Sequence, residues 1–362
     1  MKTIIVNPDD IVSLGDDGAE GFYLVTNTPY LENFSLGASN KYKHTEILSC
    51  DAQDNFIEKV LGNIPESSCV LTIMPDCLVK SVPSEVLGKR KLLIMACRSG
   101  KTGLDGIEHF LNCTANFDID RQIEAGESFF DKGEKSQYLE LVNHRQGASC
   151  RFEHLNEIYE WHEQYGRVEW NEQQVFPSGE IACFLVPLYI EKLSENTRFD
   201  LNGEIIMEGP VIVQSGPPSF QLKDQLNIHD ALTTEEGSGV KLTIKSGEII
   251  KHEPVNESGQ KAADMLSSLF AVDSRFRTIY EVGFSLNESI KLWPGNTAMN
   301  EIWGGSGGRL HLGLGMLPHT QYHIDAFCAN TQVKTDSGEV IFGPRAKSMN
   351  RRKSSHCPCV EL

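Results

Sequence analysis

Apolar residues follow two different periodicities along this chain, one before about residue 118 and another after about residue 171. In the first part, short apolar runs bounded by turn residues alternate with segments of helical spacing. The predicted strands are KTIIVN, GFYLVT, SSCVLTIMP and KRKLLIMAC, and the predicted helices are DAQDNFIEKVLGNI and GLDGIEHFLNC. This alternation is typical of a small α/β domain with some parallel pairing, and we expect the last two strands to be buried on both faces. No phosphate-binding glycine fingerprint follows the strands, which argues against a Rossmann nucleotide site.

After residue 171 the pattern becomes that of β-strands joined by short turns. The predicted strands are IACFLVPLYIE, EIIMEGPVIVQSG, VKLTIKSGEIIKHEP and EVIFGP. Asn202-Gly203 and Ser246-Gly247 are predicted hairpin turns, because such pairs suit the positive φ of two-residue loops. One predicted helix, SGQKAADMLSSLFAVDSRFRT, interrupts the strands.

Residues 119–170 are charged and are interpreted as a helical connector. The segment RFEHLNEIYEWHEQY carries a group of acidic and imidazole side chains: His154, Glu157, Glu160, His162 and Glu163. On a helix, positions 154 and 157, or 160 and 163, would share a face at a spacing that metal sites use. The alternative is a solvated acidic face beside aromatic core positions.

These patterns predict a fold of the α/β plus mixed α+β class. A small N-terminal α/β domain with its helical connector spans residues 1–170, and a β-rich metal-site domain spans residues 171–345. Residues 346–362 are predicted to form a flexible, basic, Cys-containing tail.

Charge and composition narrow the class of protein further. The formal net charge of −17 argues against nucleic-acid binding, which needs clustered Lys and Arg. No apolar run approaches the ~20 residues that span a bilayer, and the N-terminus MKTIIVNPDD turns acidic too early for a signal peptide. We therefore expect a cytoplasmic protein that does not bind membranes. Its ten scattered cysteines are expected to be free and mostly buried.

Acidic and imidazole side chains recur beside glycines in the second half of the chain. They are Glu180, Glu281, Glu301, His311, His323 and Asp325. A glutamate within an apolar strand is costly to bury unless it is paired or coordinated, and the H-x-D pair of a strand projects from one face. Carboxylate oxygens with imidazole nitrogens suit zinc, manganese, cobalt or ferrous iron. Taken singly, each residue also suits a hydrogen-bonded core position without metal.

The order of these motifs resembles a known group of proteins. The chain contains, in this order, P-S-G-E, E-V-G-F-S-L-N, N-E followed by H-L-G-L-G, and H-I-D. Over residues 172–342 this order is similar to that of the aminopeptidase T and thermophilic metallo-aminopeptidase superfamily. That superfamily also includes iron dioxygenases that cleave dihydroxypyridine rings. The resemblance implies that all six residues are metal ligands. In the aminopeptidase branch it implies two divalent ions around a bridging water. It also implies a homodimer with the site in a cleft between domains.

In the dioxygenase branch, the resemblance instead implies a facial triad of His311, His323 and Asp325 on ferrous iron. The chain departs from the peptidase branch at two positions. Ile181 stands where that branch has a glutamate as general base, and Pro318 stands where it has a tyrosine. General acid–base help is worth ~10²–10⁴-fold in rate, so loss of the base weakens the case for a peptidase. Glu301 also precedes His311 by ten residues, a wider gap than in the classical peptidases.

Three functions are therefore compatible with the sequence. The full carboxylate set favours a metal-dependent hydrolase that acts on a peptide or amino-acid amide. The missing base favours either an Fe(II) ring-cleaving dioxygenase or a non-catalytic peptide-binding protein of peptide natural-product biosynthesis. The expected ligand is a peptide or a small amino-acid-like molecule. Tyr322, Asn296 and Asn300 are predicted to orient the metal ligands or to contact the substrate.

The chain ends in RAKSMNRRKSSHCPCVEL, a basic run followed by a sequence that superficially fits a C-a-a-X prenylation box. Glu361 occupies a position that is normally aliphatic in such a box. His356, Cys357 and Cys359 form an incomplete metal-ligand set. A solvated tail is the simpler interpretation of this segment.

Overall fold

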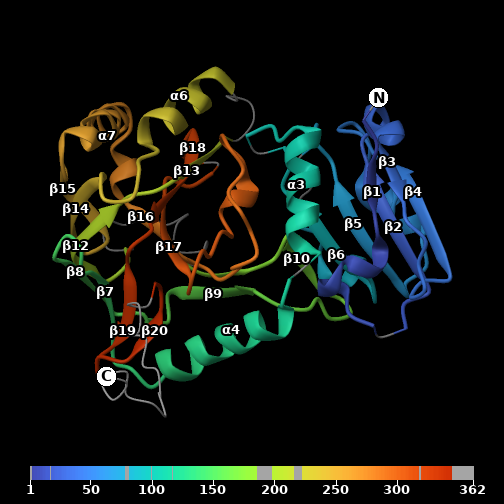
Figure 1. Cartoon of the computed structure of the whole chain (residues 1–362), viewed down its shortest axis with the longest axis horizontal. Helices are drawn as coiled ribbons and strands as arrows, with labels where there is room; N and C mark the ends of the chain where they lie inside the picture. The colour runs from blue at the N-terminus through green and yellow to red at the C-terminus, as the bar shows by residue number, and fades with distance from the viewer. Residues whose placement is uncertain are drawn as a thin grey trace, which may run out of the picture.

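The computed structural model describes residues 2–16, 18–77, 81–98, 100–115, 117–185, 198–215, 222–317 and 319–344. Figure 1 shows a sheet near the N-terminus on one side of the molecule and antiparallel sheets on the other. Within the described ranges no helix has the length and apolar character needed to cross a membrane. The tail and its CVEL end lie outside these ranges.

The N-terminal sheet has five parallel strands in the order β10-β6-β5-β2-β4. They are β2 (Gly21–Thr26), β4 (His44–Ser49), β5 (Ser68–Ile73), β6 (Lys91–Met95) and β10 (Gln173–Phe176). A separate parallel pair joins β1 (Ile4–Val6) to β3 (Phe34–Leu36). The four predicted strands of this part are confirmed, and β5 is buried at every position because apolar clusters cover both sheet faces.

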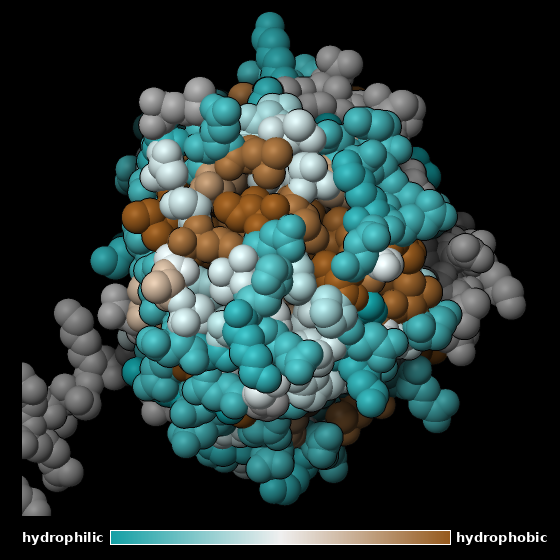
Figure 2. Space-filling model, turned by 90° about the vertical axis from the view of Figure 1, so that its right-hand side faces the viewer, coloured by the Kyte–Doolittle hydropathy of each residue, from teal (hydrophilic) through white to brown (hydrophobic). Residues whose placement is uncertain are grey.

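Short helices connect these strands. Two of them correspond to the predicted helical segments, α1 (Phe56–Lys59), which covers only part of its segment, and α3 (Leu104–Thr114). A third, α2 (Ser84–Leu87), was not predicted. Ile107 and Phe110 of α3 are fully buried in one of the apolar clusters of the sheet. Figure 2 shows that this side of the molecule exposes a band of hydrophobic residues between hydrophilic ones.

The helical interpretation of residues 119–170 is only partly correct. Helix α4 (Ile119–Gly133) is followed by three strands, β7 (Leu139–Asn143), β8 (Ala148–Phe152) and β9 (Tyr159–Gln164). The prediction of a helix in RFEHLNEIYEWHEQY was wrong, because β9 pairs with a strand of the second half of the chain. On that strand His162 and Glu160, two residues apart, share a face, with Nε2 of His162 3.1 Å from Oε1 of Glu160.

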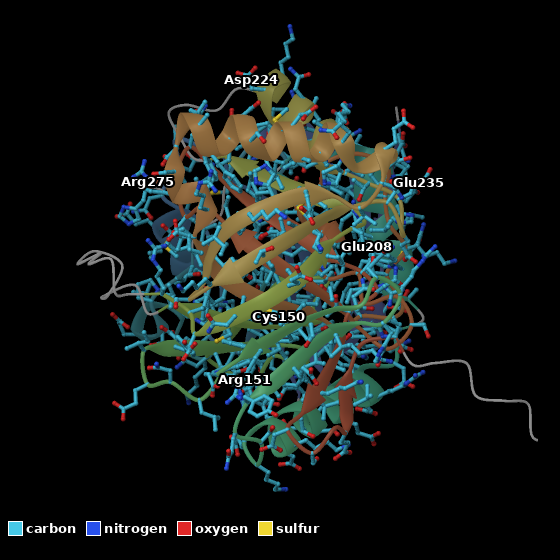
Figure 3. All side chains as sticks on the ribbon, turned by 90° about the vertical axis from the view of Figure 1, so that its left-hand side faces the viewer. Cys150, Arg151, Glu208, Asp224, Glu235 and Arg275 are labelled. Atoms are coloured by element: carbon cyan, nitrogen blue, oxygen red, sulfur yellow. The ribbon has the colours of Figure 1, made fainter. Side chains whose placement is uncertain are left out.

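A seven-stranded antiparallel sheet has the order β15-β14-β12-β8-β7-β19-β20. Its strands from the second half are β12 (Leu201–Met207), β14 (Val240–Lys245), β15 (Glu248–Pro254), β19 (Gln332–Thr335) and β20 (Val340–Phe342). Figure 3 views this sheet, with Cys150 and Arg151 adjacent on β8. Cys150 is buried and Arg151 is exposed, as the alternation of a strand requires.

One of the two predicted hairpin turns is confirmed. Ser246 and Gly247 have φ of 47° and 68° and join β14 to β15. The turn predicted at Asn202-Gly203 is wrong, because both residues lie within β12. Gly203 is instead required by the close approach of β8, since an added Cβ would meet the backbone of Ser149.

The third sheet has six antiparallel strands in the order β13-β18-β17-β16-β11-β9. Its further strands are β11 (Glu180–Leu185), β13 (Val211–Ser215), β16 (Ile279–Ser285), β17 (Arg309–Leu314) and β18 (Tyr322–Cys328). One face of this sheet joins a large apolar core through residues such as Ile181, Val282 and Leu312. Helices α6 (Leu222–Leu232) and α7 (Gln260–Val272) complete this half, the second close to its predicted bounds.

Short 3-10 helices occupy several connections between these elements. They are η1 (Pro8–Asp10), η2 (Val12–Leu14), η3 (Thr28–Asn33), η4 (Leu61–Asn63), η5 (Glu257–Gly259), η6 (Ser274–Arg277) and η7 (Ala298–Asn300). The cysteines that the structure describes are free, and all of these except the half-buried Cys113 are buried, which confirms the expectation of buried thiols for that part of the chain. Cys357 and Cys359 lie outside the described residues.

Candidate metal centre

The register of β16, β17 and β18 brings predicted ligands from distant parts of the chain onto one sheet face. His311 lies opposite Gly283, and Gly313 lies between Glu281 on one side and Asp325 on the other. Directly opposed residues of neighbouring strands project from the same face. This face is the one turned away from the large apolar core, so polar side chains gather there.

Glu180 and His323 join the same face from the flanking positions. Glu180 begins β11 and lies opposite Ser285, which is two residues beyond Gly283 on β16. His323 precedes Asp325 by two residues on β18, so the H-x-D pair projects together as predicted.

Glu301 comes from a loop rather than from the sheet, just after η7. Asn300 holds this loop closed, since its Oδ1 accepts from the Trp293 backbone N–H and its Nδ2 donates to the Trp293 carbonyl, both at 2.9 Å. The hydroxyls of Thr297 and Thr102 lie 2.6 Å apart and tie the loop to the N-terminal half. The position of Glu301 therefore depends on contacts between both halves of the chain.

Two glycines make room for the charged side chains. An added Cβ on Gly283 would overlap the imidazole of His311. An added Cβ on Gly313 would lie 2.6 Å from Cβ of Glu281 and 2.9 Å from Cε1 of His323. Glycine at these two positions therefore permits the charged side chains to lie close together.

His311 is fully buried among three carboxylates. Its Nε2 lies 3.1 Å from Oε1 of Glu180, 3.6 Å from Oε1 of Glu281 and 3.8 Å from Oε1 of Glu301. One ligand atom from each of these four residues lies within 4.8 Å of the others, which is a spacing that suits a metal ion. This set is named the first ligand group.

His323, Asp325 and Glu281 form a second ligand group of the same kind. Nε2 of His323 lies 2.7 Å from Oδ1 of Asp325 and 3.0 Å from Oε2 of Glu281. Glu281 therefore belongs to both groups, with Oε1 toward His311 and Oε2 toward His323. A carboxylate shared in this way would bridge two adjacent cations.

The other ring nitrogen of each histidine contacts a fixed polar group. Nδ1 of His323 donates to the Gly315 carbonyl at 2.6 Å. Nδ1 of His311 lies 3.3 Å from Oγ of Ser285, whose hydroxyl donates to the Glu301 carbonyl. The Nε2 atoms of both rings therefore face carboxylates while Nδ1 is held by another group, which is the orientation of histidines that bind metal.

Several of these atoms are buried and have no hydrogen-bond partner outside the cluster. They are Oε1 of Glu180, Nε2 of His311 and Oδ1 of Asp325. A buried acceptor that lacks a donor costs ~1–3 kcal/mol, and more when it is charged. Carboxylate oxygens and imidazole nitrogens that converge in this way form a donor set that fits a divalent cation.

The pKa shifts of these residues, when no cation is bound, reflect an excess of negative charge in the cluster. Burial, followed by repulsion from Asp325, Glu180 and Glu281, raises the pKa of Glu301 well above its ordinary value. Burial opposes ionisation of Glu281 too, but the two histidines outweigh it and lower its pKa to about 2. Burial would lower the pKa of His311, yet the carboxylates of Glu180 and Glu281 raise it well above its usual range.

The remaining predicted residues either lie away from the ligand groups or form hydrogen bonds with backbone groups. Tyr322 is buried on the opposite sheet face, in the apolar core, so the structure does not support its predicted contact with ligands or substrate. Asn296 bonds both backbone groups of Val213 on β13. Ile181 also faces the core, so the position after Glu180 is unsuited to a general base in this chain. Pro318 lies outside the described residues.

The sequence-based reasoning missed two polar residues beside the ligands. Ser285 contacts His311, and Nε2 of Gln214 donates to Oδ2 of Asp325 at 3.1 Å. Ser285 follows Glu281 by four residues on one strand, so alternation alone placed it on the ligand face. Gln214 had no such signal, because its position depends on the pairing of β13 with β18.

Replacing Ser285 with alanine is expected to lower the affinity for divalent metal by about 10–100-fold, because His311 loses the acceptor that orients its ring. Titration of metal-free protein with zinc or manganese measures this effect. Ser68→Ala is the matched control, since the buried hydroxyl of Ser68 has no hydrogen-bond partner to lose. Equal affinities for the two variants would show that Ser285 does not orient His311.

The fold and this cluster define an α+β protein with a candidate divalent-metal centre. No protein-family model matches the chain, and no curated protein sequence is detectably similar to it. Its structure is similar to that of 2,5-dihydroxypyridine dioxygenase from Pseudomonas putida, with a TM-score of 0.50, 13% identity, and coverage of 89% of this chain and 90% of that chain. Wild-type AmpT from Thermus thermophilus aligns with a TM-score of 0.44 and 12% identity over 91% of this chain and 94% of that chain.

The likeness to the dioxygenase confirms the predicted fold class of an α/β part joined to an α+β part. It also extends beyond residues 172–342, the part of the chain that carries the quoted motifs. At this identity the comparison concerns the fold alone, so the chemistry is argued from the residues of the cluster.

Proposed function

We propose that the chain is a metal-dependent hydrolase that holds two divalent ions and cleaves the amide bond of a peptide or amino-acid amide. The observation that carries this proposal is the division of six side chains into two ligand groups that share Glu281. A mononuclear centre needs only three protein ligands, so the additional carboxylates favour two ions. The amide substrate is inferred from the resemblance of the ligand order to metallo-aminopeptidases.

The chain's own residues would hold and orient the centre. Glu281 would bridge the two positions, while His311 and His323 would present Nε2 with their Nδ1 protons fixed by Ser285 and Gly315. Two divalent ions held there would polarise a substrate carbonyl and lower the pKa of a water. Because Ile181 faces the core, the chain offers no base at that position, and we expect a slower hydrolase than one that has it.

The facial triad of an iron dioxygenase is the second candidate, and it rests on the fold likeness to such an enzyme. In this chain the two histidines face different oxygens of Glu281 and belong to different ligand groups. This arrangement favours two ions over one ion bound by His311, His323 and Asp325. Neutral or cationic peptides remain the expected ligands if catalysis is absent.

A panel of dipeptides and amino-acid amides tests the hydrolase directly. We expect hydrolysis that depends on added zinc, manganese or cobalt and that a chelator abolishes. Oxygen consumption with 2,5-dihydroxypyridine and Fe(II), without amide hydrolysis, would contradict the proposal and support the dioxygenase. Metal and peptide binding without either reaction would support the non-catalytic peptide-binding protein.

Metal removal is expected to destabilise the fold, because it leaves buried carboxylates of like charge side by side. Restoring a divalent ion at about 100 times its Kd should add about 2.7 kcal/mol to the free energy of unfolding per ion. Thermal unfolding with and without chelator measures this difference. A melting temperature that does not respond to chelator or to added ions would contradict metal binding by the native state.

We also propose, from the resemblance, that the protein is a cytoplasmic homodimer. The band of hydrophobic surface in Figure 2 supports an interface on the side of the N-terminal sheet. Light scattering on purified protein would show a mass near twice the 40.3 kDa of one chain.

A further inference from the structure

A cavity of about 520 Å³ lies between helix α4 and residues 154–165, the segment whose helical interpretation was wrong. Trp161 of β9 lines it and stacks on Phe284, with ring centroids 5.9 Å apart. Phe284 belongs to the apolar sheet face, whereas the ligand groups project from the other face. The cavity is therefore separated from the candidate metal centre by the six-stranded sheet, and Figure 1 shows α4 running beside β9.

Aromatic rings form one wall of this cavity. Phe130 of α4 lies with its ring centroid 5.7 Å from that of Trp161 and 6.4 Å from that of Tyr165. Phe130 and Trp161 are only partly buried, so their rings are accessible from the cavity. Such rings attract a cation placed over their faces.

Carboxylates surround the rings. Those that line the cavity are Glu127, Asp131, Glu134, Glu157 and Glu163, all with exposed side chains. No Lys or Arg is among the described residues that line it. Lys132, the lysine of α4, points elsewhere and pairs with Glu339 at 2.7 Å. The field in the cavity is therefore negative.

His154 adds a buried acceptor to the same cavity. It is 4% exposed, its Nε2 donates to the Gly133 carbonyl at 2.9 Å, and its Nδ1 has no hydrogen-bond partner. Burial lowers the pKa of His154, which favours the neutral ring. The Tyr165 hydroxyl is already engaged, 2.8 Å from Oε1 of Glu127 and 2.9 Å from Oε2 of Glu163.

We propose that this cavity binds a guanidinium or ammonium group. Its polar lining offers acceptors in excess of donors, its charge is negative and its rings suit a cation, so a donor-rich organic cation complements all three properties. The group has two possible sources: an external amine or peptide side chain, or the basic residues that follow Pro344 in this chain. This inference does not depend on the metal centre or on hydrolysis.

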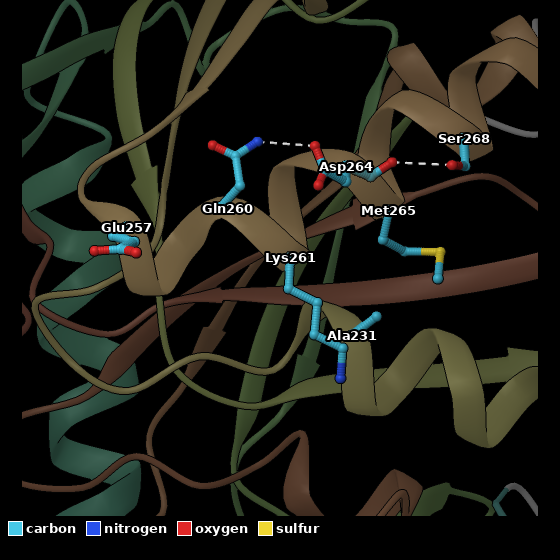
Figure 4. Close-up of a pocket in the computed structure, with 7 residues that line it drawn as sticks. All are labelled: Ala231, Glu257, Gln260, Lys261, Asp264, Met265 and Ser268. Carbon is cyan, nitrogen blue, oxygen red and sulfur yellow. Dashed lines mark hydrogen bonds between the residues drawn. The ribbon is translucent and has the colours of Figure 1, made fainter.

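A second pocket, between α6 and α7, differs from this cavity in its polar groups. Its polar groups already pair with one another: Nε2 of Gln260 donates to Oδ1 of Asp264 at 2.8 Å, and Oγ of Ser268 donates to the Asp264 carbonyl at 3.0 Å (Figure 4). Lys261 there donates to the Asp230 carbonyl at 3.0 Å. We assign no ligand to that pocket.

Calorimetric titration of the full chain with N-butylguanidinium, and with its neutral counterpart N-butylurea, tests the cation site. We expect N-butylguanidinium to bind at least about tenfold more tightly than N-butylurea, because the two probes differ mainly in charge. The double variant Asp131→Asn, Glu157→Gln should weaken N-butylguanidinium by about tenfold, and Phe130→Leu by about fivefold. Glu124→Gln, an exposed site on α4 that does not line the cavity, is the matched control and should leave binding unchanged.

The source of the natural cation is tested in the full chain by replacing Arg345, Lys347, Arg351, Arg352 and Lys353 with glutamine. Tighter binding of N-butylguanidinium to that variant would identify the chain's own residues as occupants, and unchanged binding would indicate an external ligand. Equal affinity for the two probes, or binding that persists unchanged in the Asp131→Asn, Glu157→Gln variant, would overturn the proposal. Thermal unfolding of each variant confirms that it is folded.

Discussion

Replacing Glu281 with glutamine is expected to remove metal from both positions of the centre at once. Glu281 is the residue that the two ligand groups share, so its loss takes one ligand from each. A glutamine amide has one acceptor oxygen in place of two, so it does not bridge two cations. Because replacement of an outer partner already costs about 10–100-fold in metal affinity, we expect loss of this ligand to cost more than about 100-fold at both positions.

Metal content per chain and amide hydrolysis are the two measurements for Glu281→Gln. The variant should fold, since glutamine has nearly the same shape as glutamate. Glu204→Gln is the matched control, because Glu204 is half-buried and pairs only with Lys241 at 3.4 Å among the contacts described. Retention of one full equivalent of metal in Glu281→Gln would show that Glu281 does not bridge two positions.

Replacing Gly283 with alanine is expected to disrupt the first ligand group while the fold survives. The added Cβ would overlap the imidazole of His311, which is fully buried and has little room to move. Overpacking of this kind typically costs about 1–3 kcal/mol in the free energy of unfolding. Displacement of Nε2 from the carboxylates should also reduce metal binding at that position by at least about 100-fold.

Denaturant unfolding and metal titration separate the two effects of Gly283→Ala. Gly103→Ala is the matched control, since an added Cβ there meets no atom within 4 Å. If Gly283→Ala binds metal as tightly as the control does, His311 is not a ligand in the arrangement described. If it fails to fold, Gly313→Ala tests the second ligand group in its place, since an added Cβ on Gly313 would meet Glu281 and His323.

Local periodicity predicted most of the strands and the pairing of His323 with Asp325. Successive side chains of a strand point to opposite faces, and this alternation also explains why residues next to a ligand in sequence do not belong to the site. Tyr322 and Ile181 each adjoin a ligand in sequence, and both therefore face the apolar core. Had alternation been applied to them, it would have excluded Tyr322 from the site and would have placed Ser285 in it.

Features that depend on contacts between distant segments were beyond sequence-based reasoning. The segment RFEHLNEIYEWHEQY is charged enough to suggest a helix, but pairing with β11 makes its last part a strand. Asn202-Gly203 has the composition of a turn, yet the approach of β8 places it inside β12. The division of the six residues into two groups likewise depends on the register of β11, β16 and β17, which local sequence patterns do not specify.

Metal content per chain in the native protein, compared with that of a His323→Ala, Asp325→Ala double variant, tests the central claim most directly. We predict two equivalents of zinc, manganese or cobalt in the native protein and one in the variant, because the first ligand group keeps Glu180, Glu281, Glu301 and His311. Mass spectrometry on protein purified without chelator provides both values. A single equivalent of iron in the native protein, or metal content that the double variant leaves unchanged, would contradict a centre of two ions that share Glu281.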